Sequence, residues 1–389
     1  MLSRLRLALA QAAASSATTG AAAALWTFPA MLFSAFVIAW GAEVAQFFMS
    51  QGLALAILAW LQILPEFAVE ASIAWDRNLA NMTANFTGSI RLLVGLGWPM
   101  IYATAAYVHW RRGGGLLEVI QLEEEHAVEV MGLLLPIVYF AFIWWKASLT
   151  VWDGLALTAL YLAYLWVVNR IPPKDHEEAE ELDFVPRHVM GLRPGVRGTV
   201  VAAMFLGGGL ILLVCTHPFV DSLLALAVSM GISQYVFIQW VAPFLSEFPE
   251  FLSAFRWARS VRHAPMALMN VVSSNVNQWT VLAGMIPVVY SLSLHRVAGI
   301  PFDGMHRHEI LLTVVQSLLG LLLLADLTFN WWEAVVIFVL WFVQFVVPGL
   351  RVQIIYVYLA LMGLVVLEIV AGRRRLLAFP AFVRHLRGA

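Results

Sequence analysis

Two short segments of the sequence each place a glutamate directly after a proline in an otherwise apolar stretch. They are residues 64–67 (Leu-Pro-Glu-Phe) and residues 248–251 (Phe-Pro-Glu-Phe). A proline inside a helix removes one backbone donor and frees a carbonyl upstream. A carboxylate within a membrane costs about 2.5–3.5 kcal/mol on insertion scales, so it is stable there when a cation or a proton neutralises it. The pattern therefore predicts that Glu66 and Glu250 bind cations or protons.

A polar segment follows each Pro-Glu pair at nearly the same distance. Ser89 ends the run Asn85-Phe-Thr-Gly-Ser and lies 23 residues after Glu66, while Ser274 lies 24 residues after Glu250. Each pair spans the end of one helix, a short turn and the next helix. A single Pro-Glu is typical of a kinked helix with one interhelical hydrogen bond, but the matched pair indicates an internal repeat.

The composition indicates that the elements carrying these acids lie in a membrane. Of 389 residues, 61% are hydrophobic and 12% are charged, whereas a soluble domain is about half apolar and about a quarter charged. The fold class predicted is therefore an all-α polytopic membrane protein, with the lipid bilayer as its main partner. The single cysteine, Cys215, excludes a disulfide-rich scaffold. A net charge of −1 without a basic stripe argues against nucleic-acid binding.

A helix needs about 20 mostly apolar residues to cross the bilayer, and about 10 or 11 stretches of the chain meet this requirement. The predicted spans are 25–48, 52–75, 79–108, 129–146, 149–170, 198–226, 232–256, 264–294, 309–326, 331–349 and 351–372. Five of them precede the long polar segment 171–197. Because this number is odd, the second half enters the membrane from the opposite face, which predicts two inverted-topology five-helix repeats with a site near the midplane.

These spans divide the chain into five parts. We expect an N-terminal segment (1–24), a first inverted repeat (25–170), an acidic cytoplasmic linker (171–197), a second inverted repeat (198–349), and an extra C-terminal helix with a basic tail (350–389).

The distribution of arginine and lysine predicts the orientation. Basic residues gather in alternate connections between the spans, and such connections usually lie in the cytoplasm. We therefore expect an integral protein of the cell (inner) membrane, with its N-terminus outside and its C-terminus in the cytoplasm. Residues 1–24 contain Arg4 and Arg6 and are similar to a signal peptide or an interfacial segment, which argues mildly against this orientation. The sequence does not indicate an oligomeric state.

By these residues the chain resembles the cation/calcium exchanger superfamily. Each of that family's two repeats carries Gly-Thr-Ser-x-Pro-Glu followed by Gly-Asn-x-x-Gly-Ser-Asn. The second repeat is the closer match, with Ser246, Pro249, Glu250, Asn270, Ser274 and Asn275 on motif positions. The resemblance implies that Glu66 and Glu250 coordinate the transported ions. It also implies supporting ligands from Gln62, Asn85 and Ser89 in the first copy, and from Ser246, Glu247, Asn270, Ser274, Asn275 and Gln278 in the second.

The first copy departs from the family pattern. Gln62 and Ile63 stand where the family has Thr-Ser, and Leu93 replaces a polar ligand. Ile90 replaces the motif asparagine, and Arg91 follows it. Calcium prefers six to eight oxygen ligands, so this half is poor in donors. In the second copy, glutamate takes the place of the motif serine at position 247.

Two further ionisable residues, Arg91 and Glu70, are possible charge partners of the site. Arg91 either supplies the charge of one bound sodium ion, pairs with Glu70 or Glu247, or extends its head group to the membrane interface. Glu70 lies one helical turn beyond Glu66 and therefore on the same helix face. It belongs either to an ion pathway or to a structural contact.

The function expected is secondary active antiport, with Ca²⁺ exchanged for Na⁺ or H⁺ by alternating access to a midplane carboxylate site. One alternative is a monovalent cation (Na⁺ or K⁺)/proton antiporter, which is favoured by Arg91 and by the missing ligands of the first half. Another alternative is a non-transporting homologue. The chain contains no HExxH, G-x-S-x-G or G-x-x-x-x-G-K-[ST] motif. We therefore expect a transporter rather than an enzyme, with transported cations and no cofactor.

Overall fold

The computed structural model of the chain describes residues 20–45, 47, 64–169, 182 and 184–387. In all eleven predicted spans the described residues are mainly helical. Among the described residues, seven helices are long and apolar enough to cross a membrane. One reason for the smaller number is that the predicted span 232–256 is broken into two helices of 13 and 11 residues.

The chain forms two compact units, one of residues 1–85 and 175–249 and the other of residues 86–174 and 250–389. Each unit thus takes a part of both predicted repeats. The first unit contains α2 (Ala24–Ala45), α4 (Leu64–Trp75), the first half of α5 (Leu79–Leu92), α10 (Phe184–Met190), α11 (Pro194–Ser229) and α12 (Gln234–Ser246).

The second unit contains the remaining elements. Its first part holds the end of α5, η1 (Leu93–Gly97), α6 (Trp98–Arg111), β1 (Val119–Gln121), η2 (Glu124–His126), α7 (Ala127–Gly132), α8 (Leu134–Lys146), β2 (Ser148–Leu149) and α9 (Val151–Val168). Its second part holds most of α13 (Phe248–Ala258), α14 (Ala264–Asn277), η3 (Gln278–Leu282), α15 (Ala283–Ser293), β3 (Ile300–Pro301), α16 (Gly304–Leu324), β4 (Thr328–Asn330), α17 (Trp331–Val346), η4 (Pro348–Leu350), α18 (Arg351–Val370) and α19 (Ala378–Arg387).

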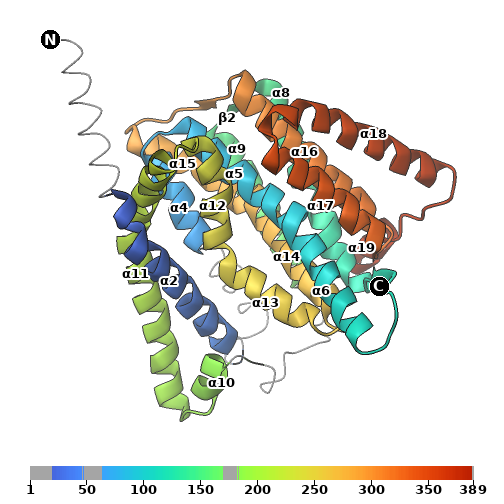
Figure 1. The fold of residues 1–389 in the computed structure, drawn as a ribbon, viewed down its shortest axis with the longest axis horizontal. Helices are drawn as coiled ribbons and strands as arrows, with labels where there is room; N and C mark the ends of the chain where they lie inside the picture. Colours follow the sequence, from blue (N-terminus) through green and yellow to red (C-terminus); the bar gives the residue numbers. More distant parts are fainter. Residues whose placement is uncertain (1–19, 46, 48–63, 170–181, 183, 388–389) are drawn as a thin grey trace. The chain divides into compact units, whose positions relative to one another are not determined.

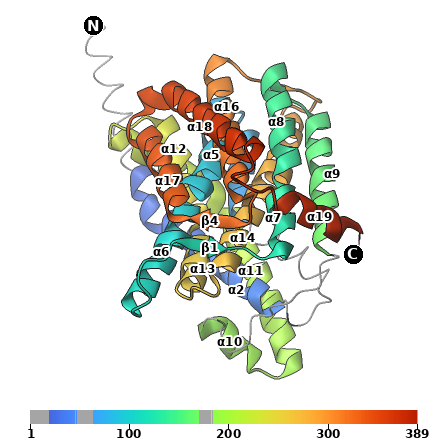
Figure 2. The same cartoon turned by 90° about the vertical axis from the view of Figure 1, so that its right-hand side faces the viewer.

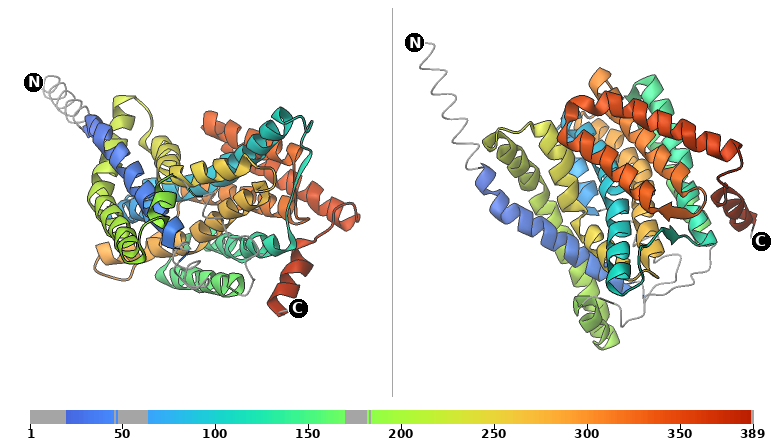
Figure 3. Two further views of the ribbon diagram at one scale, coloured as in Figure 1. Left: turned by 90° about the horizontal axis from the view of Figure 1, so that it is seen from below. Right: turned by 45° about the vertical axis from the view of Figure 1, so that its right-hand side comes forward.

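In the first unit, α2 and α11 pack along one another (Figures 1 and 3). A hydrogen bond of 2.8 Å joins the hydroxyls of Thr27 and Ser222, and Ser34 Oγ donates to the carbonyl of Gly208 at 2.8 Å. A Cβ at Gly208 would lie 2.8 Å from the side chain of Ile38, so the close approach of the two helices requires glycine there. Helices α4 and α12 both pack on this pair.

In the second unit, two series of elements match in order. The series α5-η1-α6-β1 is matched by α14-η3-α15-β3, and β2-α9 is matched by β4-α17. The strands pair across the series: β1 is antiparallel to β4 (Figure 2), and β2 is antiparallel to β3. When each element of one series is replaced by its match in the other, the pair β1–β4 becomes the pair β3–β2. A pseudo-two-fold axis therefore relates the two series. Such a relation is expected of two repeats, inverted ones included, and it agrees with the predicted two-repeat fold.

The last helix of each series begins in the same way. At the start of α9 the backbone N–H of Thr150 donates to Asp153 Oδ2 at 2.7 Å, and at the start of α17 the N–H of Asn330 donates to Glu333 Oε2 at 2.8 Å. Both are capping boxes, which satisfy the backbone donors that a helix N-terminus leaves open. Each helix therefore starts directly after its short strand.

Candidate functional site

The two glutamates of the Pro-Glu segments occupy the same place in their helices. Glu66 is the third residue of α4, and Glu250 is the third residue of α13; each directly follows a proline. Proline is tolerated there because the N–H groups of the first turn have no helical partner. Both carboxylates thus lie at the positive end of a helix dipole, which favours their charged form.

The predicted span 232–256 is interrupted at Glu247, between α12 and α13. Glu247 is buried. Ser246, also buried, donates to the carbonyls of its own helix at Ala242 (3.1 Å) and Pro243 (3.2 Å). The residues directly before α4, including Gln62, lie outside the described part of the chain.

In the second copy the structure brings the motif glutamate and the motif serine together. Ser274 is 2% exposed; its hydroxyl donates a short hydrogen bond to Glu250 Oε1 and lies 3.3 Å from the carbonyl of Asn270. Glu250 and Asn270 are half-buried. The carboxylate therefore lies against the face of α14 that carries the motif residues.

A second polar contact in this unit joins residues of both copies. Gln278 Nε2 donates to Ser89 Oγ at 2.7 Å, and Asn275 Nδ2 lies 3.4 Å from both Gln278 Oε1 and the carbonyl of Ile90. Ile90 and Asn275 are equivalent positions of the repeat, each following its motif serine. Helices α5 and α14 thus meet at the same point of the two copies. Ser89, Asn275 and Gln278 are all fully or almost fully buried.

A five-residue π-helix follows each motif serine at the same distance. Segments η1 and η3 begin at Leu93 and Gln278, four residues after Ser89 and Ser274 respectively. Such π-helical turns are rare and are frequent at functional sites. The residue types alone do not predict them, because a π-helical turn leaves no pattern in the sequence.

In the first unit, Glu66 and Glu70 are one turn apart on α4, and both are buried. Asn85 Nδ2 donates to Glu70 Oε2 at 2.5 Å. Glu70 Oε1 and Asn85 Oδ1 are buried and have no hydrogen-bond partner among the described residues. Two buried oxygen acceptors in one polar cluster are a chemically suitable place for a cation or a proton.

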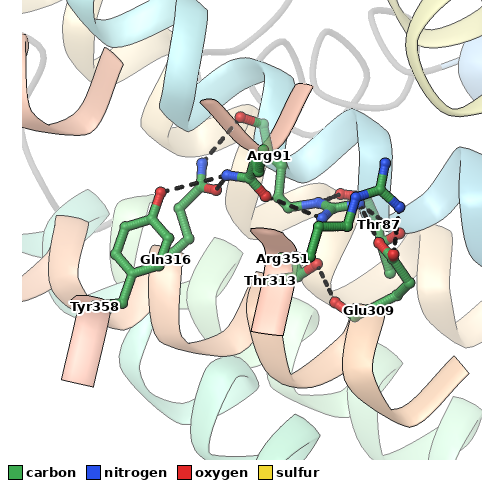
Figure 4. Close-up of polar contacts among 8 residues, drawn as sticks. Thr87, Arg91, Glu309, Thr313, Gln316, Arg351 and Tyr358 are labelled. Atoms are coloured by element: carbon green, nitrogen blue, oxygen red, sulfur yellow. Dashed lines mark hydrogen bonds and ion pairs between the residues drawn. The ribbon is translucent and has the colours of Figure 1, made fainter. Parts of the chain in front are cut away.

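Arg91 lies in the second unit and is completely buried, so the interfacial position considered for it is wrong. Its Nη2 atom forms an ion pair with Glu309 Oε2 at 2.6 Å (Figure 4). Its Nε atom donates to the Thr87 carbonyl at 3.1 Å, and its Nη1 atom donates to Gln344 Oε1 at 3.1 Å. The structure thus gives Arg91 a partner on α16 that the sequence analysis did not single out.

The Arg91 ion pair belongs to a larger buried network that joins α5 to α16, α17 and α18. Arg351 also forms an ion pair with Glu309, and Gln316 Nε2 donates to the backbone carbonyl of Arg91 at 3.0 Å (Figure 4). Gln344 Nε2 donates to Gln316 Oε1 at 2.9 Å. The signal that was overlooked is the presence of glutamine within apolar spans, since such side chains are costly in lipid.

Comparisons with known proteins give a consistent result. The model of the family described as "Sodium/calcium exchanger protein" matches residues 5–169 and 200–348. A crystal structure of an H⁺/Ca²⁺ exchanger, CAX, is 30% identical with a TM-score of 0.84, and the match covers 95% of this chain and 92% of that chain. A structure of the sodium-calcium exchanger NCX_Mj is 19% identical with a TM-score of 0.55 over 85% of this chain and 99% of that one, a likeness of fold. No curated protein matches the chain.

Proposed function

We propose that this chain, which belongs to the sodium/calcium exchanger family, is a secondary active antiporter that exchanges Ca²⁺ for H⁺ or Na⁺. The observation that carries the proposal is the contact between Glu250, at the start of a broken helix, and Ser274 of the next helix. The likeness to an H⁺/Ca²⁺ exchanger over nearly the whole chain favours H⁺ as the ion exchanged for Ca²⁺.

The transported ion would be bound by the acids of both repeats. Glu66 and Glu250 supply one carboxylate each. The candidate supporting ligands are the hydroxyl, amide and carboxylate side chains of Ser89, Ser246, Glu247, Asn270, Ser274, Asn275, Gln278, Asn85 and Gln62. Calcium takes six to eight oxygens, and carboxylates, hydroxyls and amides of this set are its usual donors. Glu70 extends the acidic cluster of the first copy by one helical turn.

Exchange follows from the cost of a bare carboxylate inside the protein. A pair of acids enclosed within the protein, Glu66 buried and Glu250 half-buried, binds either Ca²⁺ or the ions that replace it, because an uncompensated charge is unfavourable in a medium of low dielectric constant. Loading one species therefore displaces the other. Inverted repeats give the two faces of the membrane equivalent routes to such a site, which is the basis of alternating access.

The alternative of monovalent cation/proton antiport has lost one of its supports. That reading used Arg91 as a fixed charge in place of a bound sodium ion, whereas Arg91 forms an ion pair with Glu309. The replacement of a polar first-copy ligand by Leu93 still favours it.

We further propose that the N-terminus is outside and the C-terminus is cytoplasmic in the inner membrane, from the arginine distribution.

Ion flux in proteoliposomes tests the proposal. The wild-type chain is expected to take up Ca²⁺ when an outward H⁺ or Na⁺ gradient is imposed, and Glu250→Gln is expected to abolish this uptake because an amide does not supply the negative charge. Glu118→Gln is the matched control, since Glu118 is exposed and outside the site, and it should transport normally. Uptake by Glu250→Gln at the wild-type rate would contradict the assignment.

The same preparation separates the alternatives. Gradients of Na⁺, K⁺ and H⁺ imposed without Ca²⁺ reveal monovalent exchange. Stabilisation of the protein by Ca²⁺ without any flux would indicate a non-transporting homologue.

A further inference from the structure

The second unit has an open groove between α6 and α13, with a volume of about 690 Å³. Its lining is apolar at Met100, Ala103, Val108 and Phe255. The hydroxyl of Thr104, which also lines the groove, donates to the carbonyl of Met100 at 2.7 Å. This part of the lining therefore suits an apolar occupant.

Three arginines gather at one end of this groove. Arg111 ends α6, Arg112 follows it, and Arg259 directly follows the end of α13. All three side chains are exposed. In the part of the chain that the structure describes, none of the three guanidinium groups forms an ion pair with a carboxylate. Their positive charge is therefore available to an anion.

The length of the groove along α6 matches the thickness of one membrane leaflet. Met100 and Arg111 are separated by about 16 Å along α6 at 1.5 Å per residue, which is about half of a hydrocarbon core of about 30 Å. Arg111 is also the last residue of a helical stretch long and apolar enough to span the membrane. Next to it, Tyr107 and Trp110 are 56% and 62% exposed, as aromatic side chains at a membrane interface are.

From this arrangement we infer that the groove binds an anionic phospholipid. The phosphate contacts the guanidinium groups of Arg111, Arg112 and Arg259, and an acyl chain lies along Met100, Ala103 and Phe255. Basic pockets between membrane helices on the cytoplasmic side are typical of such binding, and these arginines belong to connections that the sequence places in the cytoplasm.

Lipid binding at this groove would bear on the ion site through one helix. Helix α13 carries Glu250 in its first turn and Phe255 in its second, and Arg259 directly follows it. A lipid held by Phe255 and Arg259 therefore restrains the same helix that presents the carboxylate. The binding proposal itself rests on the groove and its charges, and it stands or falls independently of the ion that is transported.

A lipid titration of the purified full chain tests the inference. Short-chain phosphatidylglycerol is added in a neutral detergent, with phosphatidylcholine of the same chain length added separately, and the thermal unfolding midpoint is followed by tryptophan fluorescence. We expect phosphatidylglycerol to stabilise the wild type at a concentration at least about tenfold lower than phosphatidylcholine. The double variant Arg111→Gln/Arg259→Gln is expected to need at least about tenfold more phosphatidylglycerol than the wild type for the same rise in its unfolding midpoint.

The control is Arg373→Gln/Arg375→Gln, which removes two exposed arginines from the same predicted face but outside the groove; it should respond like the wild type. Equal responses to the two lipids, or a wild-type response by Arg111→Gln/Arg259→Gln, would overturn the inference. The same stabilisation by inorganic phosphate alone would also overturn it. If the double variant does not fold, Ala103→Trp fills the groove without changing its charge, and it too must lose the response.

Discussion

The hydroxyl of Ser274 donates to Glu250 although the two residues are 24 positions apart, and this contact gives the second copy of the repeat its chemistry. A carboxylate that accepts from a hydroxyl and lies at a helix N-terminus is stabilised as an anion. Glu250 is only half-buried, so a cation can reach it. At this scale, the proposal that the second copy supplies part of a cation site rests on the contact between Ser274 and Glu250.

Loss of the Glu309 carboxylate should be strongly destabilising, because Arg91 and Arg351 both form ion pairs with it. Breaking a buried pair by removing one partner costs about 3–5 kcal/mol. Glu309→Gln takes the negative charge from two guanidinium groups at once, whereas Arg91→Gln leaves Glu309 paired with Arg351. We therefore expect the thermal unfolding midpoint in detergent to fall more for Glu309→Gln than for Arg91→Gln.

The exposed substitution Glu118→Gln should change the stability by no more than about 0.5 kcal/mol. If Arg91→Gln proved as damaging as Glu309→Gln, the two arginines would not share this carboxylate in the way described.

The sequence drew attention to Arg91 but not to its partner, for a physical reason. Glu309 lies 218 residues and Gln344 lies 253 residues from it in the chain. Local periodicity contains no information about contacts at such separations. The partners considered, Glu70 and Glu247, are acids close in sequence to the two Pro-Glu pairs, whereas the fold brings α16 to Arg91.

At the scale of elements, the two π-helical segments and the two strand pairs repeat the symmetry that the Pro-Glu motif first indicated. Helical spans were predictable because about 20 apolar residues in a row have few alternatives in a bilayer. The π-helices and two- or three-residue strands were not, since they depend on the packing of one copy against the other. Segment η1, for example, packs against α17 of the second series.

Gly95 of η1 provides a test of this packing. A Cβ added there would overlap the side chain of Trp341 on α17. Gly95→Ala is therefore expected to lower the stability by about 1–3 kcal/mol. In α11, Gly207 has no heavy atom near the place of its Cβ, so Gly207→Ala should be neutral or stabilising by about 0.5–1 kcal/mol. Thermal unfolding of the two variants in detergent gives the comparison, and equal effects would contradict the close contact.

At the scale of the whole molecule, the number of halves and their inversion followed from the sequence, since five spans precede the polar segment 171–197. The crossed strand pairs of the second unit agree with two copies related by a pseudo-two-fold axis. The predicted repeat boundaries differ from the two compact units, because each unit combines helices of both repeats. A compact unit contains helices of both repeats when helices of one copy pack among helices of the other copy.

The central claim is that Glu66 of one repeat and Glu250 of the other serve a single cation site. Equilibrium binding of radioactive Ca²⁺ to the purified chain, compared among the wild type, Glu66→Gln and Glu250→Gln, tests it most directly. A shared site predicts that either substitution alone removes the binding seen in the wild type. If each variant instead kept half of the bound Ca²⁺ at unchanged affinity, the two acids would belong to separate sites and the claim would be wrong.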